Sequence, residues 1–227
     1  MEHRWHTAGT NPSLWHAQRS RATYTVVPWE KLPPIDGSRH DGSFGWLAEE
    51  PERNGLRFGL DGGGEGILDD DAIARSVERA TATARRERLR VPGAFLALVS
   101  GEHLYRRIPT CTACYLEIGA RPTEIPGEPG RFLRFMNDQQ CVLVWGLHLL
   151  PDGSHRVVVA KPQFEDEAEG PTLEDVATFV DHAICADDFE EFIHRFWIEN
   201  ALFTASARPE QWTPEMKAYA AHAVARR

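Results

Sequence analysis

The sequence lacks any long hydrophobic run. Its longest apolar stretch, residues 141–150, is far shorter than the roughly 20 residues that a membrane-spanning helix needs. No apolar segment of signal-peptide length follows the first residue, so export is not expected. The 227 residues include only four cysteines, without the regular spacing of a disulfide framework, which is typical of a reducing compartment. We therefore expect a cytoplasmic protein that does not contact a membrane.

Positive charge is also scarce. The chain has 25 Lys and Arg residues against 34 Asp and Glu residues, which gives a formal net charge of −9 at pH 7. Binding to a phosphate backbone needs clustered Lys and Arg side chains, so this composition argues against a nucleic-acid binder and favours a basic partner. Hydrophobic residues make up 42% of the chain, which is enough for one folded core.

The motifs of common enzyme classes are missing as well. No Gly-x-Ser-x-Gly nucleophile motif occurs. The glycine-rich tract 61–66 contains two acidic residues that would repel phosphate, so it is interpreted as a linker. Glu191 and His194 have the spacing found in di-iron bundles, but such a site needs a second copy, and His194 is interpreted as a satisfied or surface histidine. We expect no catalytic residue, cofactor or metal.

The first 66 residues are rich in Trp, Pro and Gly and show little periodicity. Four tryptophans lie in this segment, at Trp5, Trp15, Trp29 and Trp46. A disordered tail usually lacks such large aromatic side chains. We therefore expect residues 1–66 to be an N-terminal extension that packs on a domain formed by residues 67–227.

Four helices are predicted in this domain. The first spans residues 69–89, with acidic residues at its start and arginines near its end, where each complements the helix dipole. Pro92 opens a second helix, which ends at Ser100 and Gly101. The third runs from Asp187 to about Leu202, and a short fourth helix follows Pro214. The third helix carries an apolar stripe formed by Phe189, Phe192, Ile193, Phe196 and Trp197. This stripe is expected to cover one face of a sheet.

The strands of that sheet are predicted between the second and third helices. Residues 112–118 alternate between apolar and polar side chains, and residues 131–136 form the next strand. The apolar run 141–150 indicates a central strand covered on both faces, with Trp145 in the core. A turn at residues 151–154 leads into a returning antiparallel strand at 155–160. The expected fold class is α+β, with a largely antiparallel central sheet flanked by helices.

The order of these segments resembles the SMI1/KNR4, or SUKH, superfamily, over roughly residues 69–203. The resemblance rests on a helix, a Pro-containing helix that ends in Gly, a Trp-bearing strand, a hairpin with an Asp-Gly turn, and a closing helix. The residues that carry it are Arg90 to Leu96, Ser100-Gly101, Trp145 to Leu149, Asp152-Gly153, Val157 to Val159 and Asp188 to Phe192. The chain departs from the pattern in its long N-terminal extension, in Gly146 where a larger residue is usual, and in the Cys111-Thr-Ala-Cys114 motif.

The resemblance implies a SUKH-like α+β fold and, for many bacterial members, an immunity protein that binds and neutralises a toxin, often a nuclease. Other members resemble regulatory adaptors. No catalytic residues come with the family. The expected function is therefore a non-enzymatic protein-binding module that acts as an immunity protein against a basic toxin domain. The alternative within the same fold is a regulatory adaptor without a toxin partner.

A third possibility, a thiol-dependent enzyme, depends on Cys111 and Cys114. Their spacing is shared with thioredoxin-type redox pairs and with half of a zinc site. Redox chemistry would need a thiolate at a helix N-terminus, and zinc would need a second ligand pair, but Cys141 and Cys185 are isolated. Two structural thiols beside a strand, one of them buried, are the favoured interpretation.

Two segments are predicted to contact the protein partner. The loop after the strand 131–136 offers hydrogen-bonding side chains on a rigid connection, namely those of Asp138, Gln139 and Gln140. The other segment is acidic and begins with Glu165, Asp166 and Glu167. From there to Glu191 every ionised side chain apart from His182 is acidic, which would steer a basic partner. The same acids could instead form a solvated loop and stabilise a helix start.

Overall fold

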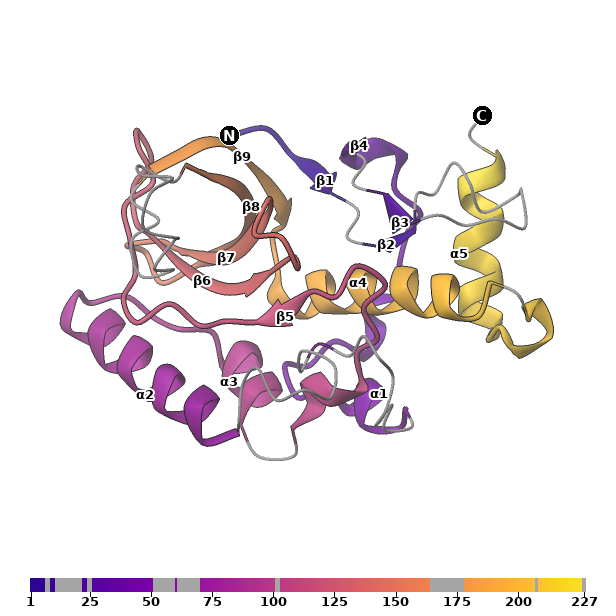
Figure 1. Ribbon diagram of the computed structural model, residues 1–227, viewed down its shortest axis with the longest axis horizontal. Coiled ribbons are helices and arrows are strands. Elements are labelled where there is room, and N and C mark those ends of the chain that lie inside the picture. Colours follow the sequence, from indigo (N-terminus) through magenta and orange to yellow (C-terminus); the bar gives the residue numbers. More distant parts are fainter. Residues whose placement is uncertain are drawn as a thin grey trace.

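The computed structural model describes residues 1–6, 9–10, 22–23, 26–50, 60, 70–100, 103–163, 178–206 and 208–225. Its main sheet has five strands in the order β5-β6-β7-β8-β9, and every neighbouring pair is antiparallel. The strands are β5 (Tyr115–Leu116), β6 (Arg131–Asn137), β7 (Val144–Leu149), β8 (His155–Gln163) and β9 (Thr178–Ala186). Figure 1 shows this sheet curled, with helices against one of its sides. The predicted α+β class is confirmed.

The helices are α1 (Gly45–Ala48), α2 (Asp70–Arg86), α3 (Gly93–Val99), α4 (Phe189–Thr204) and α5 (Pro214–Ala225). Four 3₁₀ turns are described at Trp29–Lys31, Gly37–Arg39, Leu104–Arg107 and Pro209–Gln211. Two short antiparallel ladders precede the domain, one between β1 (Arg4–His6) and β4 (Val26–Pro28), the other between β2 (Gly9–Thr10) and β3 (Ala22–Thr23).

Most predicted elements are present, with shifted ends. The predicted strand 112–118 is reduced to β5, although Cys114, Leu116 and Ile118 are buried as the alternation required. The turn before β8 has Gly153 at φ 87°, the positive value that a tight hairpin needs. Strand β9 was not predicted, because it lies inside the stretch that was interpreted from its acidic charge alone.

The main core lies between one face of the sheet and the helices α3 and α4. Its centre is a set of aromatic rings from three elements. The ring of Phe135 on β6 lies 5.2 Å from Phe189 and 5.7 Å from Phe192, both on α4, and Phe95 on α3 lies 5.5 Å from Phe189. These edge-to-face contacts fix α4 across the sheet. Trp145 is fully buried in the same core, as predicted.

Position 146 requires glycine for a steric reason, which lies on the face of the sheet opposite the main core. A Cβ atom at this position would lie 2.4 Å from the ring of Phe132 and 2.8 Å from the carbonyl oxygen of Leu133. The aromatic ring therefore occupies the space that a side chain on residue 146 would fill. Phe132 belongs to a small second core on that face, together with Ile125, Val144, Val158 and Ala160.

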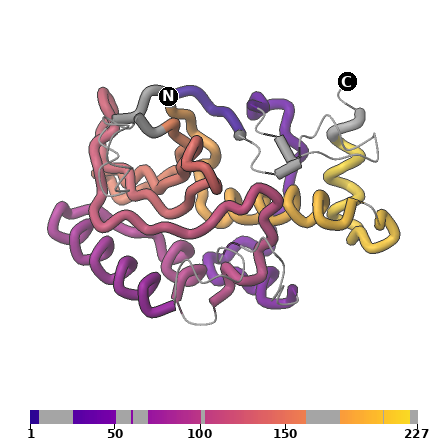
Figure 2. The backbone as a smooth tube through the Cα atoms, in the orientation of Figure 1, coloured from indigo at the N-terminus to yellow at the C-terminus, as the bar shows by residue number. Residues whose placement is uncertain are grey.

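The N-terminal segment comprises the described residues up to 50, and its first residues cover the β9 edge of the sheet. The carbonyl oxygen of Glu2 accepts a hydrogen bond of 3.0 Å from the backbone N–H of Ile184, and His3 forms a parallel bridge to the same residue. Figure 2 shows the first residues of the chain running beside β9. This contact satisfies part of an edge that would otherwise be open to another strand.

Candidate functional site

Helix α4 organises the most polar part of the interior. Asp188 caps its start, since the Asp188 side chain accepts a hydrogen bond of 3.0 Å from the backbone N–H of Glu191. Every residue from Phe192 to Leu202 is buried, so the helix is covered on all sides. Figure 1 shows α4 leaving the sheet and passing beneath the N-terminal strands to reach α5. The polar side chains of α4 from His194 to Asn200 therefore face protein rather than solvent.

Glu190 is held by the N-terminal segment. One carboxylate oxygen accepts a hydrogen bond of 2.9 Å from the indole Nε1 of Trp46, and the other accepts 2.6 Å from the backbone N–H of Gly42. Glu190 is 2% exposed, so both bonds replace hydrogen bonds to water that its carboxylate lost on folding. They attach the α1 region to the first turn of α4.

His194 links three elements one turn further along. Its Nδ1 lies 2.8 Å from Nε2 of His40, and its Nε2 lies 2.8 Å from Oε1 of Glu215 on α5. The ring of Trp46 covers it, with centroids 4.4 Å apart. The histidine is buried and satisfied, which is one of the two outcomes predicted for it. Burial, and then the neighbouring His194, lowers the pKa of His40, so a positive charge on the His40 ring is unfavourable.

Arg195 points from α4 into a ring of aromatic side chains. Its guanidinium donates 2.7 Å to the carbonyl oxygen of Pro33 and 3.1 Å to the hydroxyl of Tyr219. The guanidinium carbon lies 5.8 Å from the ring centroid of Trp5, 5.3 Å from Trp29 and 5.9 Å from Tyr219. Cation–π attraction offsets part of the cost of burying this charge.

Glu199 is the last member of a polar layer that α4 forms with the buried side chains of Glu190, His194 and Arg195. Its carboxyl group accepts hydrogen bonds of 2.8 Å from Nε1 of Trp5 and 2.7 Å from the hydroxyl of Tyr219. Burial raises the pKa of Glu199 to about 7, although both hydrogen bonds and Arg195 act in the other direction. Trp5 and Trp46 thus use the polar tips of their rings to bond buried acids of α4, and Trp29 packs on the arginine between them.

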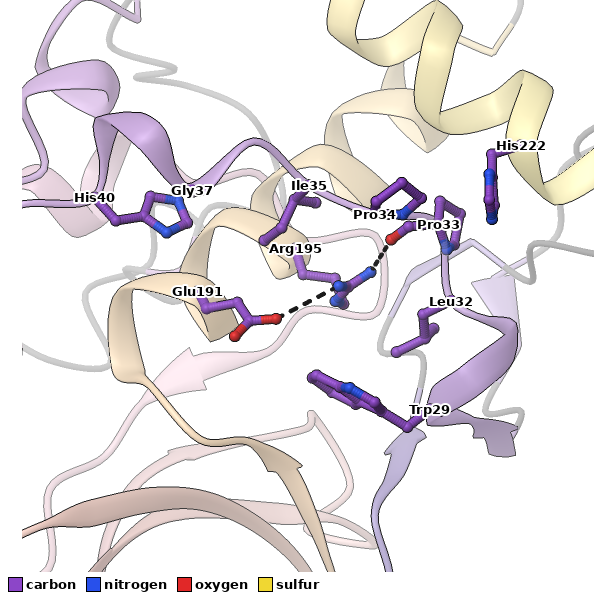
Figure 3. A pocket seen from close by; sticks show the side chains of 10 residues that line it. All are labelled: Trp29, Leu32, Pro33, Pro34, Ile35, Gly37, His40, Glu191, Arg195 and His222. Carbon is purple, nitrogen blue, oxygen red and sulfur yellow. Dashed lines mark hydrogen bonds and ion pairs between the residues drawn. The ribbon is translucent and has the colours of Figure 1, made fainter.

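A cavity of about 440 Å³ opens beside this layer. Trp29, Leu32 and Ile35 supply apolar walls, and His222 of α5 closes one side. Figure 3 shows the guanidinium of Arg195 extending among these side chains. The polar layer and the cavity were not predicted from the sequence. Two features of the sequence could have indicated them. Glu190, His194 and Arg195, at positions i, i+4 and i+5, interrupt the apolar stripe of α4, and the N-terminal segment is rich in tryptophan.

The predicted recognition loop is only partly exposed. Gln139 and Gln140 are exposed, as expected, but Asn137 and Asp138 are fully buried. The carboxylate of Asp138 accepts a hydrogen bond of 2.8 Å from the backbone N–H of Leu143, so it serves the loop itself. The expectation that Asp138 is presented on the surface is therefore corrected, because its oxygens are used inside the turn. Glu165, Asp166 and Glu167, like Trp15 and the tract 61–66, lie outside the described residues.

The two cysteines of the Cys-x-x-Cys motif occupy a coil before β5. The backbone N–H of Cys111 donates 2.9 Å to the side-chain oxygen of Asn200 on α4, and Cys114 Sγ lies 3.3 Å from the hydroxyl of Thr112. Burial raises the pKa of the Cys111 thiol well above its usual range and that of the Cys114 thiol to about 12. Both thiols are protonated near neutral pH, which is unfavourable for a nucleophile.

Among the described residues, no three His, Cys, Asp or Glu side chains are close enough together to hold a metal ion. Nor is any described helix both long and apolar enough to cross a lipid bilayer. Comparison of the chain with protein-family models, with curated proteins and with solved structures gives no match.

Proposed function

We propose that this chain is a non-enzymatic protein-binding module of the SUKH type, and that it acts as an immunity protein by direct contact with a basic toxin domain. The order of elements supports this proposal. A helix (α2), a short helix preceded by Pro92 (α3), a strand bearing Trp145 (β7), a hairpin and the closing helix α4 follow one another as the resemblance implies.

The observation that carries the proposal is the rigid loop between β6 and β7. Besides the carboxylate bond to Leu143, the backbone N–H of Asp138 donates 3.1 Å to the carbonyl oxygen of Leu143, and Cys141 donates 3.1 Å to that of Asp138. Cys141 takes the left-handed conformation, with φ 54°. A loop closed by its own buried acid loses little entropy when it binds.

The tip of this loop suits protein contact. Val142 is 50% exposed and is one of three large apolar side chains that are exposed among the described residues, the others being Met1 and Val26. Gln139 and Gln140, which precede it in the same loop, add exposed donors and acceptors. An apolar side chain with polar neighbours on a rigid loop is typical of an interface centre with its rim. The net charge of −9 favours a basic partner.

A matched pair of variants tests the role of this loop. Val142→Lys places a positive charge at the loop tip, and Val26→Lys places the same charge on β4 at a site of similar exposure, 46%. Each variant is co-expressed with the toxin encoded beside this chain's gene, and its binding to the purified toxin domain is titrated. The wild type and Val26→Lys should restore growth, whereas Val142→Lys should bind at least about tenfold more weakly.

Three results would contradict the proposal. If no toxin gene lies beside this one, or if folded wild-type protein does not restore growth, the immunity role is wrong and the adaptor role gains support. If Val142→Lys and Val26→Lys bind alike, the β6–β7 loop is not the interface. If the Lys variants differ while binding is unaffected by salt, the partner is not selected by its charge.

A further inference from the structure

The outer face of α2 carries arginines that the contact through the β6–β7 loop does not use. The helix buries Ile73, Ala80 and Ala84 on one side. At about 100° per residue, Arg79 and Arg86 lie about 120–140° away from that side, and they are two turns, or about 10 Å, apart. Both side chains are exposed, and Figure 1 shows no other described helix or strand on the outer side of α2. This row of the helix therefore faces solvent.

Positive charge is concentrated on this part of the chain. Residues 75–90 contain six arginines and two glutamates, a local charge of +4, so the remaining residues together carry −13 of the formal total of −9. One of the two glutamates, Glu87, is already paired with Arg131, whose Nε lies 3.2 Å from its carboxylate. Five exposed arginines of this stretch form no ion pair with any described residue, and together they are called the arginine face: Arg79, Arg85, Arg86, Arg88 and Arg90.

Arg88 holds a backbone conformation that favours glycine. At the end of α2 the backbone N–H of Leu89 donates 2.8 Å to the carbonyl oxygen of Ala84, and that of Arg88 donates 3.0 Å to the carbonyl oxygen of Arg85. This pair of bonds is a Schellman ending, and Arg88 has φ 60°. Glycine usually occupies this position because a β-carbon is strained there. An arginine here gives up stability, which indicates a use for its side chain outside the fold.

The dipole of α2 accounts for only part of the arginine face. Cations stabilise a helix mainly from its last turn, which contains Arg85 and Arg86. Arg79 lies two turns before the end of the helix, and Arg90 lies beyond it. The remaining arginines therefore need another explanation.

We propose that the arginine face docks an acidic α-helix of a partner protein, which lies along α2. Arginine binds carboxylates through paired, charge-assisted hydrogen bonds. The two turns between Arg79 and Arg86 match carboxylates at positions i and i+7 of the partner helix. A nucleic acid fits less well, because its charges continue about every 1.7 Å beyond α2 and would meet a chain that is otherwise negative. This contact goes beyond the immunity contact and uses none of the residues of the β6–β7 loop.

The first test titrates the full chain with a helical peptide of about 16 residues whose glutamates recur at i, i+4, i+7 and i+11. At an ionic strength of about 20 mM it should bind saturably, and at least about tenfold more tightly than the same peptide with glutamine at those positions. If neither peptide binds at up to about 1 mM, or if both bind alike, the proposal is wrong. Tighter binding of a single-stranded RNA oligonucleotide or of phosphatidylglycerol vesicles would also overturn it.

The second test locates the binding site with two double variants. Arg79→Gln with Arg86→Gln removes two charges from the arginine face, and Arg208→Gln with Lys217→Gln removes two charges from exposed positions near α5. The first variant should bind the Glu peptide at least about tenfold more weakly, and the second should change binding by less than about threefold. Equal losses would mean that only the net charge matters. Both variants should still neutralise the toxin, so this test can fail without the immunity role failing.

Arg88→Gly distinguishes binding from a structural role. Glycine relieves the strain at φ 60°, so the midpoint of thermal unfolding should rise while binding of the Glu peptide weakens by about threefold or more. A lower midpoint with unchanged binding would make Arg88 a structural residue and would remove it from the proposed contact.

Discussion

The two sides of α4 are buried by opposite chemistry. Toward the sheet the helix presents Phe189 and Phe192, whose rings meet Phe135 edge to face. Toward the N-terminal segment and α5 it presents Glu190, Arg195 and Glu199, each of which is at most 4% exposed. The first side gains free energy by removing apolar surface from water, whereas the second mainly recovers hydrogen bonds that burial would otherwise forfeit.

The two kinds of burial have different consequences. Burial of apolar side chains provides stability, whereas burial of acids determines which segment can pack against them. Apolar contacts tolerate other side chains of similar volume, but a buried acid is tolerated only where donors reach it. The carboxylates of Glu190 and Glu199 each receive an indole N–H from a tryptophan of the N-terminal segment. We infer that the polar side fixes where the N-terminal segment docks, and that the apolar side provides most of the stability.

The largest expected effect concerns the apolar side. Phe192→Ala removes a fully buried ring that contacts Trp5 at 5.4 Å and Phe135 at 5.7 Å. The free energy of unfolding, measured by urea denaturation, should fall by about 3–5 kcal/mol because a cavity remains. Val26→Ala, at an exposed site, should change it by less than about 0.5 kcal/mol. A loss below about 1 kcal/mol in Phe192→Ala would show that this side is not the main source of stability.

The next effect concerns Glu199 and depends on pH. Burial raises its folded-state pKa to about 7, above the value of about 4.5 that it has when unfolded. The folded state therefore binds the extra proton, and the stability that this gives is full below pH 4.5 and is lost as pH rises to about 7. The loss is about 3 kcal/mol at most. Glu199→Gln should flatten the profile between pH 5 and 8, and an unchanged slope in this variant would assign the dependence to other groups.

A smaller effect tests the docking of the N-terminal segment. Trp46→Phe removes the N–H that donates 2.9 Å to Glu190 and leaves that buried acid with fewer donors. The expected cost is about 1–3 kcal/mol. In a Glu190→Gln background the same substitution should cost less, because no charge is left underbonded. Equal costs in both backgrounds would mean that the bond contributes little beyond ring packing.

The smallest expected effect concerns the rate at which an alkylating reagent modifies the thiols of Cys111 and Cys114. Cys114 is fully buried and its pKa is raised to about 12, so very little thiolate exists near neutral pH. Iodoacetamide at pH 7.5 should modify Cys111 and Cys114 much more slowly in the folded protein than in urea-unfolded protein. Rapid modification of either thiol in the folded state would favour the thiol-dependent enzyme over the binding module.

The sheet could be predicted from the sequence because its signals are local. The apolar run that became β7, the Asp-Gly turn and the alternation around Leu116 each require only neighbouring residues. The polar layer could not, because the donors for Glu190 and Glu199 come from residues 144 and 194 positions away. Asp138 was misplaced for a related reason, since a polar residue in a loop gives no sign of whether its oxygens face water or the loop backbone.

The bond between Trp5 and Glu199 also constrains how the chain reaches its native state. Trp5 is synthesised 194 positions before its partner. During translation the indole N–H groups of Trp5 and Trp46 lack their native acceptors, Glu199 and Glu190, until α4 leaves the ribosome. Contacts of such long sequence separation slow folding and leave hydrophobic surface exposed in the meantime. The nascent chain should therefore need chaperone protection until α4 has been made.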